Sequence, residues 1–300
     1  MNTHLAKSTD HGETWTFLKA INSAFETTIA LNSQNIDGQW TNEVPSLVYD
    51  PDDPGREWKL FSHKYFVKKP YSDYEENRII QTMYIAYKYA HTPEELDSAE
   101  EFVLFGAGGS PVVPGPAKYD LNSFNPGLSQ TILYSEPGVF YKDGVLYMSL
   151  SAVATDTQDH KMILLSSSDH GENWALVEIF TANTDAAFFG AAVLTASSLV
   201  EEKGRIFILF APVVLEGDSG KHNGTYIVEV TDISTGQLKR NIEGGLVVHK
   251  YLAPSFDSSN AGESDYDKYN SNGGIIFSQK NDAEFPEVFQ VFNTKQKIID

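Results

Sequence analysis

The stretch Ser8-Thr9-Asp10-His11-Gly12-Glu13-Thr14-Trp15 recurs along the chain as Ser167-Ser168-Asp169-His170-Gly171-Glu172-Asn173-Trp174. Both copies fit the pattern S-x-D-x-G-x-x-W, and six of the eight positions are identical. An Asp carboxylate can accept hydrogen bonds from the backbone N–H groups that follow it, Gly supplies a positive φ, and Trp covers the apolar side of a hairpin. A hairpin motif repeated 159 residues apart indicates a repeat protein.

The repeated motif resembles the Asp-box (BNR repeat) of the sialidase superfamily. In that superfamily the Asp-box joins the third and fourth strands of a propeller blade. It lies on the outer rim of the propeller, away from the ligand. The resemblance therefore implies a fold and says little about activity.

The rest of the chain is typical of an all-β protein, with short β-branched and aromatic runs between Gly, Asp, Asn and Pro. The best helical candidate, residues 92–97, amounts to one N-capped turn. Residues 106–130 contain too much Gly and Pro for a strand and are expected to form a long loop. The strand runs fall into five groups, at residues 5–21, 44–105, 138–180, 191–241 and 263–293. We therefore predict a single domain over residues 1–300, a five-bladed β-propeller with a partial first blade and a six-bladed ring as the alternative.

The first Asp-box begins at residue 8, where the middle of a blade is expected. Two explanations compete. Either the ring closes by pairing both termini in one blade, or the start is truncated and an exported leader is missing. The first seven residues have no apolar core and do not form a signal peptide. If an exported leader is missing, we expect the protein to be secreted or periplasmic.

Composition excludes several classes of function. The net charge is −19, from 41 acidic against 22 basic residues, which argues against binding nucleic acid or an anionic membrane and suits a neutral or cationic partner. No run approaches the 18 or so apolar residues of a membrane span. Cysteine is absent, which excludes disulfides and thiolate chemistry. We predict neither a metal site nor a cofactor, because the histidines are scattered and no phosphate-binding glycine motif is present.

Three glutamates precede runs that are expected to be innermost strands. Glu43 precedes residues 44–49, Glu136 precedes residues 137–141, and Glu263 precedes Ser264-Asp265-Tyr266. In a propeller the first residues of such strands face the central channel. Carboxylates that converge there repel one another, so one should keep its proton near neutral pH. Cleavage of a glycosidic bond needs one neutral carboxylic acid and one carboxylate, which makes these three residues the catalytic candidates.

The sequences that follow Glu43 and Glu136 are similar to strands of the five-bladed glycosidases, in which an acid, a Pro and an aliphatic run begin an inner strand. The resemblance implies a glycoside hydrolase that acts on a polysaccharide or glycan. Those families usually take their catalytic base from an Asp on the first blade, and this chain has no recognisable counterpart.

Further polar residues are expected at the channel face, beyond the ends of the second strands. His63 and Tyr65 could bind sugar hydroxyls, and Tyr65 or Phe66 could stack on a pyranose face; packing in the core is their other use. The full set of candidate substrate-binding residues is His63, Tyr65, Asp265, Gln279 and Arg78.

Two other functions remain open from the sequence. The protein could be a non-catalytic propeller that binds a glycan or a protein, with the acidic channel serving only as a surface. It could also be a sialidase. Resemblance to the sialidases would imply three arginines that bind the substrate and an Arg-Ile-Pro sequence. The chain has four arginines and no Arg-Ile-Pro, and only Arg78 is expected near a cavity.

Overall fold

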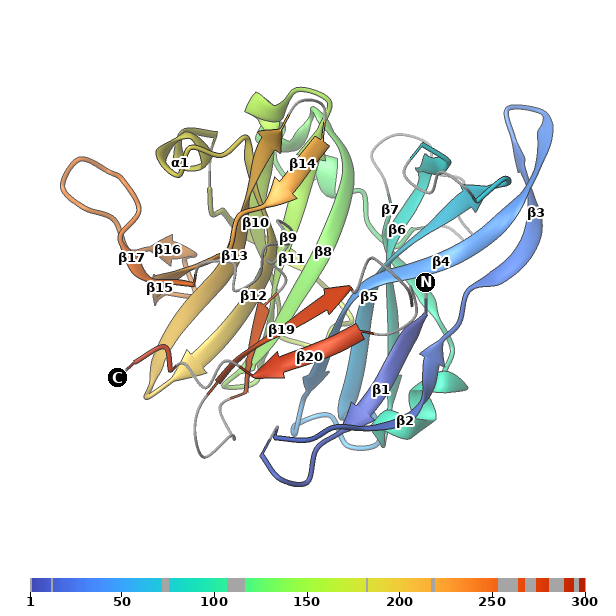
Figure 1. The fold of residues 1–300 in the computed structure, drawn as a ribbon, viewed down its shortest axis with the longest axis horizontal. Helices are drawn as coiled ribbons and strands as arrows, with labels where there is room; N and C mark the ends of the chain where they lie inside the picture. Colours follow the sequence, from blue (N-terminus) through green and yellow to red (C-terminus); the bar gives the residue numbers. More distant parts are fainter. Residues whose placement is uncertain are drawn as a thin grey trace.

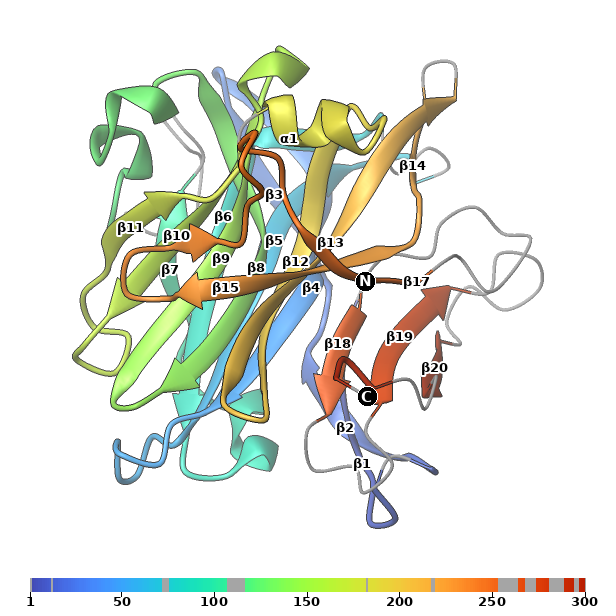
Figure 2. The same cartoon turned by 90° about the vertical axis from the view of Figure 1, so that its left-hand side faces the viewer.

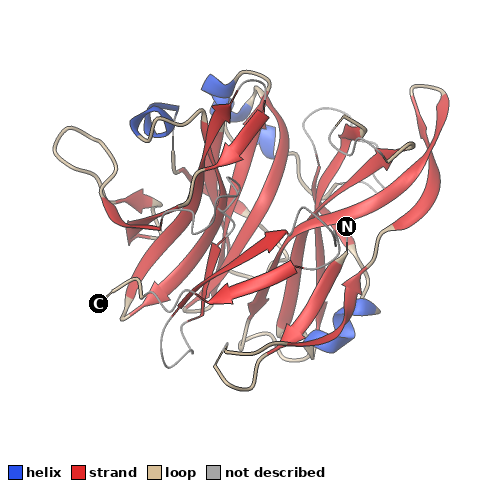
Figure 3. Ribbon diagram, in the orientation of Figure 1, coloured by secondary structure: helices blue, strands red, loops and turns tan. Residues whose placement is uncertain are grey.

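The computed structural model of the protein describes residues 2–11, 13–71, 76–106, 117–181, 183–216, 219–252, 264–267, 274–280, 289–293 and 297–299. Strands dominate these ranges (Figure 3). Their helical content is limited to α1 (Asn183–Phe188) and the short 3-10 turns η1 (Pro93–Asp97), η2 (Leu121–Ser123), η3 (Pro126–Leu128) and η4 (Thr157–Asp159).

The described strands form five antiparallel sheets, which follow one another along the chain (Figures 1 and 2). Sheet 1 contains β1 (Thr3–Lys7) and β2 (Thr16–Asn22). Sheet 2 contains β3 (Phe25–Leu31), β4 (Gln34–Tyr49), β5 (Trp58–Lys68), β6 (Arg78–Ala90) and β7 (Phe102–Gly106). Sheet 3 contains β8 (Thr131–Lys142), β9 (Val145–Ala154), β10 (Lys161–Ser167) and β11 (Ala175–Ile179).

Sheet 4 contains β12 (Val193–Glu202), β13 (Arg205–Glu216), β14 (Ser219–His222), β15 (Thr225–Asp232), β16 (Gln237–Leu238) and β17 (Val248–Leu252). Sheet 5 contains β18 (Ser264–Asp267), β19 (Gly274–Lys280) and β20 (Phe289–Asn293). The groups of runs expected from the sequence correspond to these sheets in order.

The leading strands of successive sheets are neighbours. In sheets 2 to 4 the strands are laid out in sequence order from β4, β8 and β12 outward, with β3 added as a hairpin on β4. β4 lies against β8, β8 against β12, and β12 against β18. Small antiparallel sheets whose inner strands neighbour one another are the blades of a propeller. The prediction of an all-β propeller is confirmed.

Apolar cores fill the spaces between successive blades. The strand β10 shows how the sequence builds them, because its residues 162–165 are all buried. Ile163 and Leu165 belong to the core shared with sheet 2, whereas Met162 and Leu164 belong to the core shared with sheet 4. Successive side chains of a strand point to opposite faces, so the sequence of a strand that is buried on both faces is a continuous apolar run.

Sheets 1 and 5 carry the two ends of the chain. Leu5 and Ile21 of sheet 1 pack with Leu60 of sheet 2 and Leu96 of η1. Sheet 5 lies beside sheet 1 in both views (Figures 1 and 2). Among the described strands the two sheets share no ladder of hydrogen bonds, so a blade built jointly from both termini is not formed by these residues.

The two repeated S-x-D-x-G-x-x-W turns have the expected hydrogen bonds. Asp169 accepts from the backbone N–H of Asn173 at 2.7 Å and from Ser167 Oγ at 2.9 Å, and Asp10 accepts from the N–H of Thr14 at 2.9 Å. The tryptophans differ, which the sequence did not predict: Trp174 is 5% exposed and Trp15 is 39% exposed. Trp174 lies edge-on to rings of the neighbouring sheet 2, whereas Trp15 remains largely open to solvent.

Two further expectations need correction. The helix α1 was not predicted, because six residues are too few to show helical periodicity. In the segment 106–130, expected to be one long loop, residues 107–116 lie outside the described residues, and the described remainder contains the end of β7 at Gly106 and two 3-10 turns before β8. The turn expected at residues 92–97 is present as η1. No helix in the described part of the chain has the length and apolar character needed to span a bilayer.

Candidate functional site

The innermost strands of sheets 2, 3 and 4 carry the same β-bulge. Each has two residues opposite one residue of the next strand, which is one extra residue, and the first of the two adopts a positive φ. The three positive-φ residues are Val44 (φ 44°) in β4, Glu136 (φ 57°) in β8 and Ala196 (φ 50°) in β12. A positive φ is strained for a residue with a Cβ, and bulges of this kind often re-aim side chains beside active sites.

The bulges correct the positions expected for Glu43 and Glu136. Neither residue begins a strand; β4 and β8 run through them from Gln34 and Thr131. Each strand has a Pro in its middle, where the backbone is irregular, and in the sequence this Pro resembles the start of a strand. The two glutamates are also not at equivalent positions, because Val44 occupies the place of Glu136 and Glu43 occupies the place of Ser135.

The carboxylate of Glu136 is held where β8 meets β12. Its Oε2 atom accepts hydrogen bonds from Ser151 Oγ on β9 and from the backbone N–H of Ala196 on β12, both at 2.8 Å. The hydroxyl of Thr195 donates to the same oxygen. These three hydrogen bonds from described residues all go to Oε2, and the Glu136 residue is half-buried.

The charge of Glu136 affects the pKa of His222, which lies at the end of β14. Burial lowers the pKa of the His222 imidazole, and the negative charge of Glu136 opposes this shift. The sequence analysis did not select His222, Ser151, Thr195 or Ala196. They come from three strands, and no short motif connects them.

Glu43 lies on the neighbouring inner strand, opposite His63 in the ladder of β4 and β5. Thr41 and Tyr65 form another pair of this ladder, on the same face of the sheet. The His63 and Tyr65 rings are 5.2 Å apart, and the Arg78 guanidinium lies 5.7 Å from the centre of the Tyr65 ring. Sheet 2 therefore brings Glu43, His63, Tyr65 and Arg78 together.

Burial limits what this group can bind. His63 is 4% exposed and Tyr65 and Phe66 are 0% exposed, because β5 continues to Lys68 instead of ending after Phe61. The two aromatic rings belong to cores on opposite faces of sheet 2 and have no open face for a pyranose. Burial and the nearby Arg78 lower the pKa of His63 to about 3, so its imidazole is neutral at physiological pH.

The remaining candidates lie in or before sheet 5. Glu263 lies outside the described residues. Asp265 is in β18 opposite Ile276, and Gln279 is in β19 opposite Gln290. Because β18 lies against β12, sheet 5 continues the series of blades beyond the bulge of β12.

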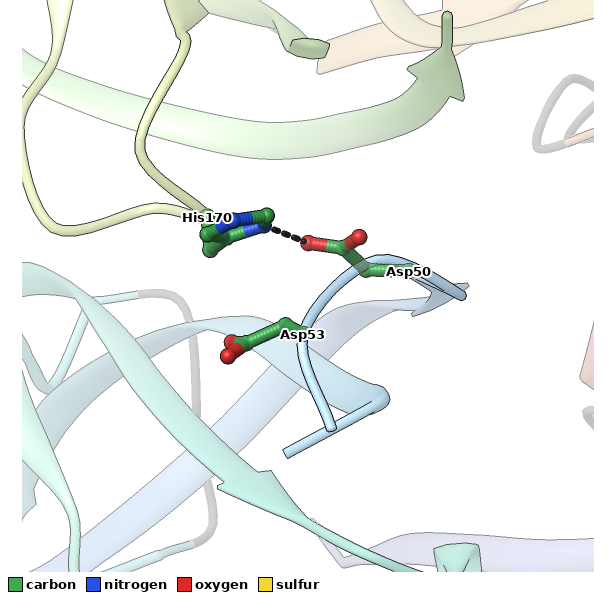
Figure 4. Close-up of side chains that lie close together, drawn as sticks. All are labelled: Asp50, Asp53 and His170. Atoms are coloured by element: carbon green, nitrogen blue, oxygen red, sulfur yellow. Dashed lines mark hydrogen bonds and ion pairs between the residues drawn. The ribbon is translucent and has the colours of Figure 1, made fainter. Parts of the chain in front are cut away.

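A cluster outside the predicted site contains residues that often bind metals. Asp50, Asp53 and His170 each offer a ligand atom, and these atoms lie within 4.8 Å of one another (Figure 4). The buried ammonium group of Lys59 is already among them, 2.5 Å from Asp53 Oδ2 and 3.7 Å from Asp50 Oδ2. The cluster thus contains its own cation, and this set of residues does not fit a metal ion.

Three of the four arginines are paired with carboxylates at separate places. Arg56 pairs with Asp53 and Glu172, Arg205 with Glu229, and Arg240 with Asp185. The fourth arginine, Arg78, lies over the Tyr65 ring. The structure therefore does not assemble an arginine triad.

Comparisons of sequence find no relative. No family profile matches the chain. No curated protein sequence matches it significantly.

Comparison of the fold finds solved structures that are similar to this one. A glycosyl hydrolase from Bacteroides ovatus superposes with a TM-score of 0.50 at 12% identity, over 91% of this chain and 72% of that one. A candidate glycoside hydrolase from Parabacteroides distasonis gives 0.50 at 12% identity, over 95% and 74%. A candidate glycosidase from Bacteroides thetaiotaomicron gives 0.51 at 11% identity, over 91% and 75%. At these identities the likeness is one of fold, and the chain shares its fold with proteins described as glycoside hydrolases.

Proposed function

We propose that this protein is a glycoside hydrolase of the propeller type, which acts on a polysaccharide or glycan through carboxylates of its inner strands. The observation that supports the proposal best is the setting of Glu136. Its carboxylate projects from a strained bulge and is oriented by donors from β9 and β12. A catalytic group needs its position fixed in this way before the substrate arrives.

Two-carboxylate hydrolysis needs a second acid within reach of the same bond. We assign this role to Glu43, which lies beside the equivalent bulge of the neighbouring inner strand. Glu263 is proposed as the third member of the group. The three residues would divide the acid, the base and the tuning of the pKa among them.

The charge of the protein supports a class of substrate, and that class in turn supports a location for the protein. The charge of −19 favours a neutral or cationic glycan over an anionic one. Structural polysaccharides lie outside the cytoplasm, so a protein that cleaves them would be secreted or periplasmic.

A panel of aryl-glycosides tests the proposal. We expect the wild type to release the aryl group from at least one glycoside and the Glu136→Gln variant to lose this activity by at least about 100-fold, as for loss of a general acid or base. Glu243→Gln, which makes the same change at an exposed turn, is the matched control. Equal turnover by the wild type and Glu136→Gln would remove Glu136 from the mechanism.

The second candidate is a propeller that binds a glycan without cleaving it. One observation favours it: the three hydrogen bonds to Glu136 tie β8 to β9 and β12, which a purely structural glutamate would also do. On this alternative the wild type is inactive on every glycoside, and Glu136→Gln lowers the thermal stability.

We also propose that the two repeated turns are Asp-boxes of the sialidase superfamily. The second copy joins β10 and β11, the third and fourth strands of sheet 3, as in that superfamily. Membership would not make the protein a sialidase, because three of its four arginines are paired with carboxylates at separate places.

A further inference from the structure

The hairpin of β3 and β4 extends beyond the rest of sheet 2. β3 pairs with residues 34–40 of β4, whereas β5 joins the ladder of β4 only from Gly38 onward. The tip of the hairpin is therefore a two-stranded ribbon, which projects from the body at the upper right of Figure 1. A ribbon of two strands is marginally stable in water unless a further strand or another element packs on it.

The turn of this hairpin fixes the hydrogen bonds between its strands. Asn32 (φ 50°) and Ser33 (φ 63°) both have a positive φ, as in a two-residue type I′ turn. Leu31 and Gln34, which flank such a turn, form a hydrogen-bonded pair. Hydrogen-bonded and non-hydrogen-bonded pairs alternate along an antiparallel ladder, so every second residue of β3, counted back from Leu31, bonds to β4.

The other residues of β3 direct their backbone groups outward. The N–H and C=O groups of Glu26, Thr28 and Ala30 point away from β4 on this alternation. The partner of Thr28 in the ladder is Asp37, whose carbonyl accepts the Lys69 N–H on the other side at 3.0 Å. This bond agrees with the alternation. β3 thus presents three donors and three acceptors along its outer edge.

The outer edge of β3 lacks the usual protection of an edge strand. β3 is the terminal strand of sheet 2 in the described part of the chain. Natural edge strands are commonly blunted by Pro, by Lys or by a bulge. The sequence of β3 contains neither Pro nor Lys, and its pairing with β4 is regular over all seven residues. This edge is therefore suited to accept another strand.

The strand is complementary to itself. When a second copy of β3 is placed antiparallel about its central residue, Thr28 lies opposite Thr28 of the second copy and Glu26 lies opposite Ala30. Both are hydrogen-bonded pairs in this register. Phe25, which is 50% exposed, lies opposite Leu31 in a non-hydrogen-bonded pair, where side chains are closest. The pairing covers an exposed aromatic ring with an aliphatic side chain.

The charges of β3 also favour a second copy of the chain. Two copies with a net charge of −19 repel each other in general, but Glu26 is paired with Lys69 at 2.9 Å and would face the neutral Ala30. The two Glu26 residues of the pair would be roughly 14 Å apart along the ladder, beyond the Debye length of about 8 Å at physiological ionic strength. The projecting ribbon therefore offers a contact at which the repulsion is small.

We propose that β3 is a dimerisation edge, through which two copies of this chain pair antiparallel about a two-fold axis at Thr28. The two copies of sheet 2 then form one continuous sheet, and each copy presents the same surface to the other, as a two-fold axis requires. The contact of one strand is small for a protein interface, so the dimer should be weak, with a Kd of about 1–100 μM. The inference goes beyond the proposed function and does not depend on it.

Sedimentation velocity at about 1 to 300 μM protein tests the inference. The deciding variants are Ala30→Lys, which places a cation opposite Glu26, and Ala30→Glu, which places a second anion there. Each change acts twice in a two-fold dimer. Ala175→Lys and Ala175→Glu are the matched controls, because Ala175 is an exposed alanine of β11, the terminal strand of sheet 3.

We expect the wild type to form more dimer as its concentration rises, and more at about 0.5 M than at about 0.15 M salt, because salt screens the repulsion between the copies. Ala30→Lys should lower the Kd by at least about threefold, and Ala30→Glu should raise it by at least about threefold. The Ala175 variants should match the wild type. Thermal melting followed by circular dichroism checks that each variant is folded.

A wild type that is monomeric at every concentration and salt would overturn the inference, and the edge would then be left to a different partner. Equal Kd values for Ala30→Lys and Ala30→Glu would also overturn it, because the dimer contact would then lie elsewhere. Tighter dimerisation of Ala30→Lys cannot result from unfolding, so this variant decides the matter even if Ala30→Glu is unstable.

Discussion

The Nδ1 atom of His170, in the second copy of the repeated motif, lies 3.0 Å from Oδ2 of Asp50, in the loop after β4 of the preceding sheet. Two residues further on, Glu172 accepts a hydrogen bond from Arg56 of the same loop at 2.7 Å. Residues at the variable positions of the repeated motif thus connect sheet 3 to sheet 2. The motif closes its own turn through Asp169 and holds the neighbouring blade through His170 and Glu172.

The charge of Lys59 should be essential to this connection. Its buried ammonium serves both Asp50 and Asp53, so Lys59→Met removes the buried cation that the two carboxylates share and leaves Asp53 with Arg56 and Asp50 with His170. We expect the free energy of unfolding to fall by about 3–5 kcal/mol, measured by urea denaturation. Lys68→Met, at the exposed end of β5, is the matched control. Similar losses for both variants would show that the cluster contributes little.

The two tryptophans of the repeated motif should differ in energetic importance. Trp174 packs edge-on against Phe61 and Phe105 and is buried, whereas Trp15 is 39% exposed. We expect Trp174→Ala to lower the free energy of unfolding by about 3–5 kcal/mol. Trp15→Ala should cost clearly less, because much of its ring already contacts water. Chemical denaturation of both variants makes the comparison, and an equal loss would contradict it.

Gly138 should tolerate no side chain. A Cβ at this position would lie 2.2 Å from the carbonyl oxygen of Ser197 on β12 and 2.8 Å from Ser149 Oγ. Because one of these atoms is backbone, Gly138→Ala must push β8 and β12 apart, at a cost of about 1–3 kcal/mol or more. At Gly245 the nearest atom is 3.4 Å away, so Gly245→Ala is the control. Thermal melting of both variants tests whether the close approach exists.

His63 should make the protein less stable in acid. Its folded pKa of about 3 lies below the value of 6.5 for an unperturbed histidine. Between these values the unfolded chain binds a proton that the folded protein does not, so stability falls as the pH decreases from 6.5 toward 3. The slope is at most about 1.4 kcal/mol per pH unit.

The His63→Leu variant should therefore lose less stability than the wild type between pH 7 and pH 5. Urea denaturation at the two pH values measures the difference, with His4→Leu on the exposed face of β1 as the control. A wild type and a His63→Leu variant with the same pH dependence would show that burial of His63 does not shift its pKa.

Local patterns in the sequence predicted the fold well and the site less well. The repeated turns and the apolar run of β10 identify blades, because a hairpin and a doubly buried strand are set by neighbouring residues. The sequence predicts Glu43 and Glu136 as channel residues because each precedes what resembles the start of an inner strand. This reason is wrong, because the feature is a bulge in the middle of the strand. The partners of Glu136 could not have been predicted, because Thr195 is 59 residues away and approaches only when β12 packs on β8.

The sequence by itself determined the all-β character, the repeat and the order of the blades, since turn residues and alternation act over a few positions. Only the tertiary structure decided which polar groups are buried, which aromatic rings face solvent, and where β8, β9 and β12 enclose a carboxylate. The bulges of three inner strands and the burial of His63 depend on contacts between blades that are distant in the chain. Such contacts leave no periodic signal in the sequence, so they were decided by packing.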